Sequence, residues 1–327
     1  MTVQGTSTVE NNLQKVLEEL EAARKMQDDW INNGVDFVDL YVEDAGGDWL
    51  EKWGKYEEEL EHRKIKQVDV EAVKAAIDLS DFGETQLLEI ALSRPSYHSA
   101  SEQDVKHKRL SLLGAAIFGA VVTDYLYREY PQLDAEAISN LKMSLAEPEK
   151  LAELACNFKL NELCWCSELL LVTDSSEYNR FLSESFEALF GAIYLEFDRD
   201  LFRAGNWPIQ QSIATTVGAH LEGTQQPKNA AENELKRREI LGADILEAIA
   251  IDYLYNRFPE RNAKELTRWK NLLVAKEIFP KDFKAKLGSH YLELQSNFSR
   301  TRDWLVDNFI TTAVDELEEE AGDRFIS

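Results

Sequence analysis

Cysteine and histidine are scarce in this sequence, and the common catalytic motifs are missing. Three cysteines and five histidines occur among 327 residues, too few cysteines for a disulfide framework. The segment Cys164-Trp165-Cys166 lacks the two-residue spacing of common zinc sites, and no two histidines have the H-x-x-x-H spacing. Neither a glycine-rich phosphate loop nor a G-x-S-x-G motif is present. We expect Cys156, Cys164 and Cys166 to be ordinary buried thiols, and we expect no small-molecule substrate.

Long apolar runs and targeting patterns are missing as well. Nowhere do about 18 apolar residues run together, as a membrane span requires. The first residues, MTVQGTSTVENN, have the features of neither a signal peptide nor a transit peptide. The hydrophobic fraction is 44% and the mean hydropathy is −0.39. The sequence therefore predicts a soluble, cytoplasmic protein with no membrane partner.

Positive charge is in short supply. Thirty-six basic residues stand against 60 acidic ones, which gives a formal net charge of −24. Such a field repels phosphate backbones at long range. A nucleic acid would therefore have to bind at a local basic patch.

Strand patterns are also nearly missing. No stretch alternates apolar and polar residues with a period of two, and the β-like run Leu169–Thr173 is too short to carry a sheet. Apolar residues recur instead at intervals of three and four, which is typical of helices. The sequence predicts an all-α protein.

The sequence does contain an internal repeat. The segment Arg109–Pro131, RLSLLGAAIFGAVVTDYLYREYP, returns as Arg237–Pro259 at a constant offset of 128 residues. A Leu-Gly pair, an Asp-Tyr-Leu-Tyr segment and the final proline occur in both copies. Each copy predicts a buried helix that ends near its proline. An ungapped match of this length predicts two related domains in one chain.

Further helices are predicted around each copy of the repeat. A helix–turn–helix segment begins at Val70 and ends before Pro95, with its turn at 81–83. Other helices are predicted at 135–144, 148–158, 183–196, 263–273 and 283–293, and a loop is predicted at 223–234. The last two helices match parts of 135–144 and 183–196 in sequence. We therefore set the domains at 70–212 and 213–327, the second being shortened and ending in an acidic tail.

Residues 1–69 predict an acidic helical extension. Apolar residues between Glu10 and Trp30 follow a helical period, and the mixed charges of Glu57–Lys66 are typical of a solvated helix face. The extension also carries Trp49 and Trp53. These tryptophans predict docking, either onto the chain's own core or onto a protein partner.

Four segments of the first copy resemble the endonuclease domain of the ribonuclease III family, in the family's order. They are ALSRPSYHS from Ala91, RLSLLGAAIFG from Arg109, DYLYREYP from Asp124 and SESFEALFGAIYLE from Ser183. The second copy is similar to a shortened form of this domain. The resemblance implies an all-helical fold with double-stranded RNA as ligand. It also implies that the two domains pair as an intramolecular pseudo-dimer with a valley for RNA.

The resemblance further implies where two nuclease sites would lie. The family holds Mg²⁺ with four carboxylates, two of them four residues apart on one helix and two of them three residues apart on another. The corresponding positions are Ser111, Ala115, Glu184 and Glu187 in the first copy, and Glu239, Ala243, Lys281 and Lys284 in the second. Because two acids remain in the first site and one in the second, we expect both sites to be inactive. Asp244 would point about 100° away from Ala243 on its helix and should not substitute.

One acidic pair keeps an alternative open. Mg²⁺ is often held by one or two carboxylates and water, so Glu184 and Glu187 would suffice for weak Mg²⁺-dependent cleavage of double-stranded RNA. The other interpretation is that both are surface charges on an amphipathic helix. In that case no cofactor is expected.

Two basic clusters begin the equivalent helices of the two copies and are candidate phosphate contacts. They comprise Lys106, Lys108 and Arg109 in the first copy and Lys236, Arg237 and Arg238 in the second, with Lys281 and Lys284 at the second site. If they line the valley, the protein binds structured RNA or a ribonucleoprotein without cutting, as an RNA-processing or ribosome-associated accessory factor. If they are only solvated helix starts, the paired domains serve as a protein-interaction scaffold.

Overall fold

The computed structural model describes residues 68–94, 102–166, 175–206, 213–214, 217, 230–275, 279–280 and 282–326. The chain divides into two compact units, Met1–Lys64 and Ile65–Ser327, and every described residue belongs to the second. The helix predicted at Glu10–Trp30, the charge run Glu57–Lys66 and the tryptophans of the extension lie outside the described residues.

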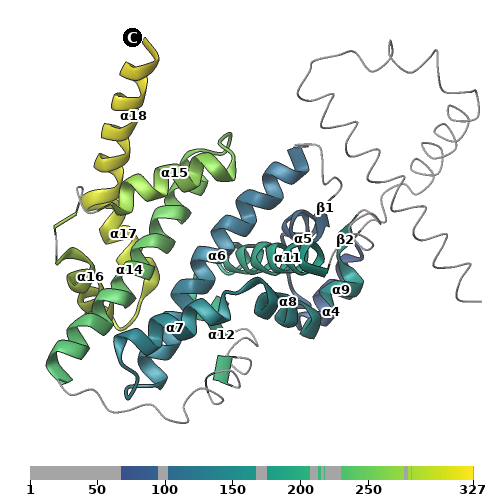
Figure 1. Ribbon diagram of the computed structural model, residues 1–327. Helices are drawn as coiled ribbons and strands as arrows, with labels where there is room; N and C mark the ends of the chain where they lie inside the picture. Colours follow the sequence, from purple (N-terminus) through teal and green to yellow (C-terminus); the bar gives the residue numbers. More distant parts are fainter. Residues whose placement is uncertain are drawn as a thin grey trace, which may run out of the picture. The chain divides into compact units, whose positions relative to one another are not determined.

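Helices make up nearly all of the described chain, which confirms the predicted all-α fold (Figure 1). In chain order they are α4 (Val70–Ala76), α5 (Thr85–Leu92), α6 (Glu102–Glu129), α7 (Ala135–Leu145), α8 (Pro148–Asn157), α9 (Leu160–Leu163), α11 (Ser175–Glu196), α12 (Leu201–Asn206), α14 (Ala230–Arg257), α15 (Ala263–Val274), α16 (Phe283–Glu293), α17 (Phe298–Leu305), a π-helical turn (Val306–Ile310) and α18 (Thr311–Ile326). The sequence predicted most core helices to within a few residues, but α6 and α14 begin seven residues and α11 eight residues before the predicted starts.

Two short strands were not predicted. β1 (Ser93–Arg94) pairs in parallel with β2 (Trp165–Cys166). Two residues are too few to show a period of two, so the pattern could not reveal them. The run Leu169–Thr173, where the sequence is most strand-like, lies outside the described residues.

Two other predictions are wrong in part. The loop predicted at 223–234 extends too far, because α14 begins at Ala230. The segment Ala230–Glu234 contains alanine and glutamate, which favour helices, and the turn-forming residues end before it. Cys156 is exposed and Cys164 is half-buried, so Cys156 is not the buried thiol that we expected.

The duplicated helices α6 and α14 form the centre of the fold. Each has 28 residues. Helix α6 packs against α11, α14 packs against α16, and α6 and α14 pack against each other (Figure 1). Their equivalent leucines, Leu113 and Leu241, are fully buried. The apolar stripe that the repeat conserves is therefore the core of both copies.

Glycines allow the closest helix contacts in each repeat. A Cβ atom on Gly114 would lie 1.7 Å from the backbone oxygen of Glu187, and one on Gly242 would lie 1.8 Å from that of Lys284. No side chain fits at either distance, so the close approach of the two helices requires the glycine of each Leu-Gly pair. The two contacts hold α6 on α11 and α14 on α16 in the same register.

Among the described residues, one helix is long and apolar enough to cross a membrane. This is α6, whose best 18-residue window has a mean hydropathy of 1.5, although it contains no unbroken apolar run of that length. Within the structure 67% of that window is buried. Its apolar surface is therefore accounted for by packing in the core.

Candidate functional site

The first-repeat site lies where α6 crosses α11. Ser111 on α6 donates a hydrogen bond of 2.8 Å from its Oγ to Oε2 of Glu187 on α11. The close contact of Gly114 with α11 brings the two side chains together, because it lies one turn further along α6. Ser111 is 7% exposed. A buried hydroxyl group thus fills the position where the family resemblance implies a carboxylate.

Burial controls the charge of Glu187. Removal from water raises the pKa of its carboxyl group to about 7, while the hydrogen bond from Ser111 lowers this pKa and the neighbouring Glu184 raises it. The group is therefore only partly ionised at neutral pH. Because a carboxyl group must lose its proton to ligate a metal, Glu187 is a weak ligand in this setting.

The other two positions of the first site, Glu184 and Ala115, add little to its capacity to bind a metal ion. Glu184 forms an ion pair with Arg180, with 3.0 Å between Oε1 and Nε, and Ala115 has no side-chain oxygen. The part of the chain that the structure describes contains no group of three or more His, Cys, Asp or Glu side chains able to hold a metal ion. The four positions of the first site do not fit a carboxylate cage for Mg²⁺.

The second-repeat site has opposite charges at the equivalent positions. Glu239 on α14 is exposed and Lys284 on α16 is half-buried. Among the described residues, no hydrogen bond or ion pair links these two side chains as Ser111 is linked to Glu187. Lys281 lies outside the described residues. An ammonium group beside one carboxylate offers no cation site.

Arg109 crosses from the first repeat to the second. Its guanidinium group donates hydrogen bonds of 2.8 Å to the carbonyl oxygens of Tyr255 and Phe258, and another to that of Arg261. It also lies 4.9 Å from the centre of the Tyr255 ring. Tyr255 lies in the last turn of α14, and Phe258 and Arg261 lie in the turn that follows it, so Arg109 caps the end of that helix and the turn after it.

Arg237 makes the mirrored contacts with the first repeat. It donates hydrogen bonds of 2.7, 3.4 and 3.0 Å to the carbonyl oxygens of Tyr127, Tyr130 and Pro131. Both arginines are only 5% exposed. The prediction that Arg109 and Arg237 contact RNA phosphates is therefore corrected, because their guanidinium groups cap helix ends inside the protein. The reciprocal contacts are those expected of an intramolecular pseudo-dimer.

The other cations of the two basic clusters lie at the surface or near it. Three are paired with an acid one turn earlier, Lys106 with Glu102, Lys236 with Glu232 and Arg238 with Glu234, at N–O distances of 2.6, 2.7 and 2.9 Å. Lys108 is exposed and makes no ion pair within the described residues. Exposed pairs contribute less than about 1 kcal/mol, so a phosphate group can displace them. These four residues remain candidate RNA contacts.

Two buried aspartates at equivalent positions were not singled out from the sequence. Asp124 pairs with Arg128, with 2.9 Å between Oδ2 and Nη2. Asp252 pairs with Arg199 of the first repeat at 3.1 Å and with Arg302 at 3.7 Å. Burial raises the pKa of both aspartates and the arginines lower it. Their signal in the sequence was the duplicated Asp-Tyr-Leu-Tyr segment, in which both aspartates occur.

Asp244 lies where the helix geometry predicted, away from the second site. It accepts a hydrogen bond of 2.7 Å from Nζ of Lys142 and another from the hydroxyl group of Thr123, both in the first repeat. Asp244 is 7% exposed. It holds the two repeats together and does not replace the acid missing at Ala243.

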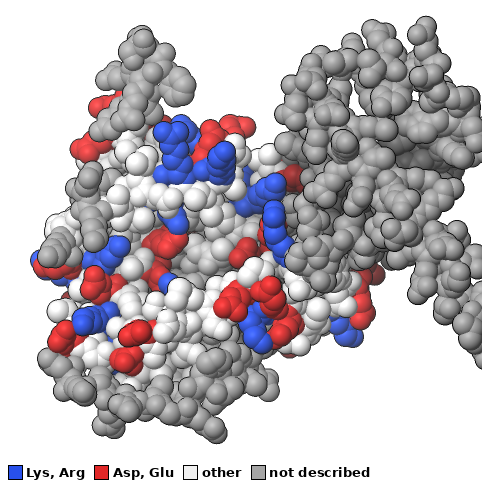
Figure 2. All heavy atoms as spheres, in the orientation of Figure 1, with Lys and Arg blue, Asp and Glu red and all other residues white. Residues whose placement is uncertain are grey.

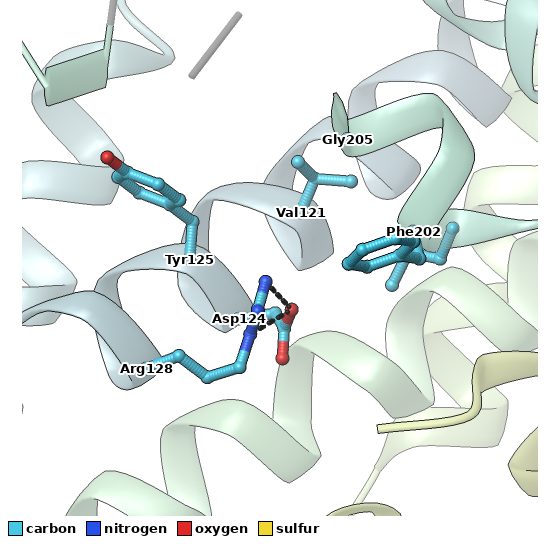
Figure 3. A pocket seen from close by; sticks show the side chains of 7 residues that line it. Val121, Asp124, Tyr125, Arg128, Phe202 and Gly205 are labelled. Atoms are coloured by element: carbon cyan, nitrogen blue, oxygen red, sulfur yellow. Dashed lines mark hydrogen bonds and ion pairs between the residues drawn. The ribbon is translucent and has the colours of Figure 1, made fainter. Parts of the chain in front are cut away.

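A small pocket opens between α6 and α12, near the Asp124–Arg128 ion pair (Figure 3). Val121 and Gly205 form part of its wall, and the ring of Phe202 lies at its edge, 59% exposed. Arg128 points across Asp124 in this view and pairs with its Oδ2 atom. The pocket therefore presents a neutral ion pair and apolar walls, and no unpaired catalytic group.

Comparisons with known proteins agree with the geometry. Residues 84–201 match a family model described as Ribonuclease-III-like. Ribonuclease 3 of Bdellovibrio bacteriovorus is 33% identical over 116 residues, which cover 35% of this chain and 50% of that protein. Ribonuclease 3 of Shewanella loihica is 29% identical over 154 residues, covering 43% and 68%. Over residues 84–201 the chain is therefore similar to the ribonuclease III family.

A solved structure of the nuclease domain of ribonuclease III from Campylobacter jejuni also matches. It is 23% identical, with a TM-score of 0.39, and the match covers 46% of this chain and 99% of that domain. The chain spans about half the length of the curated relatives it matches first.

Proposed function

We propose that this chain is a non-catalytic ribonuclease III-like protein that binds structured RNA or a ribonucleoprotein and acts as an accessory factor in RNA metabolism. One observation carries the proposal. The hydroxyl group of Ser111 is hydrogen-bonded to Glu187 inside the first-repeat site, where phosphodiester hydrolysis by metal ions would require charged oxygens. Similarity to the ribonuclease III family supports RNA as the ligand, and the altered site argues against cutting it.

The electrostatics of the site favour the same conclusion. Mg²⁺ binding must overcome the raised pKa of Glu187 and the ion pair of Glu184 with Arg180. Mg²⁺ also gives up its water reluctantly and is rarely held by so few protein ligands without help from the substrate. The weakly active endonuclease therefore remains the second alternative, to be tested by cleavage.

The first alternative is a protein-interaction scaffold. The net charge of −24 favours it, since most of the surface repels RNA. In that case the interlocked repeats would serve only as a rigid platform. The scaffold and the RNA-binding protein differ in a property that is simple to measure, the dependence of RNA affinity on salt.

Binding of a labelled double-stranded RNA to the full chain, at 50 and 200 mM salt with and without Mg²⁺, tests the proposal. We expect an affinity that falls steeply with salt, because cations are released when phosphates are contacted, and that does not depend on Mg²⁺. The absence of salt-sensitive binding at 50 mM salt would refute the RNA-binding role and leave the scaffold.

A further inference from the structure

We propose that the RNA backbone binds at one end of the paired repeats, on a surface formed by Lys108, Arg261, Lys264 and Arg268. This surface is called the α15 basic surface below. The inference rests on the proposed function, that the chain binds RNA, and it assigns the binding to residues that the sequence did not single out, apart from Lys108. The equivalent end of the other repeat lacks the same charges.

Arg109 brings the parts of this surface together. Its hydrogen bonds to the carbonyl oxygens of Phe258 and Arg261 fix the start of α6 against the turn between α14 and α15. Lys108 is the preceding residue on α6 and is exposed. The first basic cluster therefore supplies a buried arginine, Arg109, that joins the repeats, and an exposed lysine, Lys108, directly before it in the sequence.

Aromatic rings hold Arg261 in place. Its guanidinium carbon lies 4.7 Å from the ring centre of Phe258 and 4.4 Å from that of Trp269. Within the described residues its guanidinium group has no carboxylate partner. A planar guanidinium group stacked in this way keeps its donors available in a fixed plane, which suits a phosphate group with two acceptor oxygens.

Lys264 and Arg268 extend the surface along α15. They are four residues apart and so lie on one face of the helix. Both are exposed, and in the described part of the chain neither forms an ion pair. Glu265, the acid between them, is engaged at the helix start, where it accepts a hydrogen bond of 3.0 Å from the backbone of Asn262. Figure 2 shows basic side chains over α15 and towards the start of α6, with some acidic ones among them.

The other end of the paired repeats provides an internal comparison. The positions equivalent to Arg261, Lys264 and Arg268 are Leu133, Glu136 and Asn140. Between 257 and 270 the chain has five basic and two acidic residues, whereas between 129 and 142 it has one basic and three acidic. The fold repeats at both ends but the positive charge does not, so packing does not require it.

A local group of cations matters for RNA binding because the protein as a whole has a net charge of −24. The field of the whole protein repels a polyanion, and a local group of unpaired cations supplies the place where it can bind. An acidic protein segment would be attracted by the same charges. A guanidinium group pairs with carboxylate as well as with phosphate, so the choice of RNA rests on the proposed function, and the experiment includes the acidic polymer as a separate probe.

The test uses the full chain and a labelled double-stranded RNA without a defined sequence. The variant Lys264→Glu/Arg268→Glu changes two exposed side chains. We expect its affinity at 50 mM salt to fall at least tenfold. We also expect the slope of log affinity against log salt to decrease in size by about two, since each phosphate contact contributes about one.

A matched control carries the same change in net charge elsewhere. Lys150→Glu/Arg300→Glu replaces a half-exposed lysine and an exposed arginine that lie outside the surface and are not candidate RNA contacts, and we expect a change of less than threefold. Equal weakening by both double variants would overturn the surface assignment, as would RNA binding unchanged by Lys264→Glu/Arg268→Glu. Tighter binding of polyglutamate than of RNA to the unaltered chain would also overturn it. If the unaltered chain shows no salt-sensitive RNA binding, the proposed function itself fails.

Discussion

The guanidinium group of Arg237 donates a hydrogen bond of 2.7 Å to the carbonyl oxygen of Tyr127, and so joins the start of one central helix to the end of the other. Arg109 makes the equivalent bond to Tyr255 at 2.8 Å. Each arginine lies over the ring of the tyrosine whose carbonyl it binds. The chain therefore uses an arginine that is present in both copies to connect its repeats.

Replacement of Arg237 by leucine should destabilise the protein by about 3 kcal/mol, because the carbonyl groups of Tyr127 and Pro131 would lose a charged donor while buried. Urea denaturation monitored by circular dichroism measures this free energy of unfolding. The exposed neighbour Lys236 is the control, and its change to alanine should cost less than about 1 kcal/mol. Equal stability of the two variants would show that the bonds of Arg237 contribute nothing.

Two glycines on one helix should respond in opposite ways to alanine. Gly114→Ala places a methyl group 1.7 Å from the backbone oxygen of Glu187, so α6 and α11 must separate, and we expect a loss of about 3 kcal/mol or more. Around Gly119 there is nothing within 4 Å of the added atom. Gly119→Ala should stabilise α6 by about 0.5–1 kcal/mol. A thermal unfolding series compares both with the unaltered chain, and a Gly114→Ala variant as stable as Gly119→Ala would contradict the packing described.

The raised pKa of Glu187, about 7 against an ordinary value of 4.5, makes a prediction about pH. The folded protein holds this proton more tightly than the unfolded chain does, so ionisation costs stability as the pH rises from 4.5 to 7. Glu187→Gln removes that cost. The variant should gain up to about 3 kcal/mol over the unaltered chain between pH 4.5 and pH 8, at about 1.4 kcal/mol for each unit of pKa difference.

Ser111→Ala provides the partner experiment to Glu187→Gln. Because the hydrogen bond from Ser111 lowers the pKa of Glu187, its loss should move the midpoint of the Glu187 titration to higher pH. An NMR titration of the glutamate carboxyl carbons follows this directly. A midpoint near 4.5 in the unaltered chain would show that Glu187 is ordinarily solvated and would remove one argument against metal binding.

The repeat and the core helices could be predicted from the sequence, because apolar spacing and a constant offset of 128 residues both record packing. The role of Arg109 could not be read from its basic cluster. Lys108 and Arg109 are neighbours in sequence, yet on a helix they point about 100° apart, and one is exposed while the other is buried. Identity between the copies gives no signal that separates the two, because Lys108 and Lys236 match at the same offset as Arg109 and Arg237.

The site positions were predicted by resemblance, but their chemistry depends on contacts made across the fold. Ser111 and Glu187 are 76 residues apart in the sequence. Only the structure, in which α6 and α11 cross at Gly114, shows that Ser111 donates a hydrogen bond to Glu187. The α15 basic surface was missed for a similar reason. Arg261, Lys264 and Arg268 are unremarkable in sequence, and become a group when Arg109 and Trp269 fix their surroundings.

The most direct test of the central claim is a cleavage assay of a long double-stranded RNA with 10 mM Mg²⁺ at pH 8, where Glu187 is ionised and the first-repeat site has its best opportunity to bind metal. A catalytically active ribonuclease 3 serves as the positive control. The account predicts that the full chain binds this RNA at low salt and leaves it uncut. Mg²⁺-dependent cleavage by the unaltered chain that Glu187→Gln abolishes would contradict it.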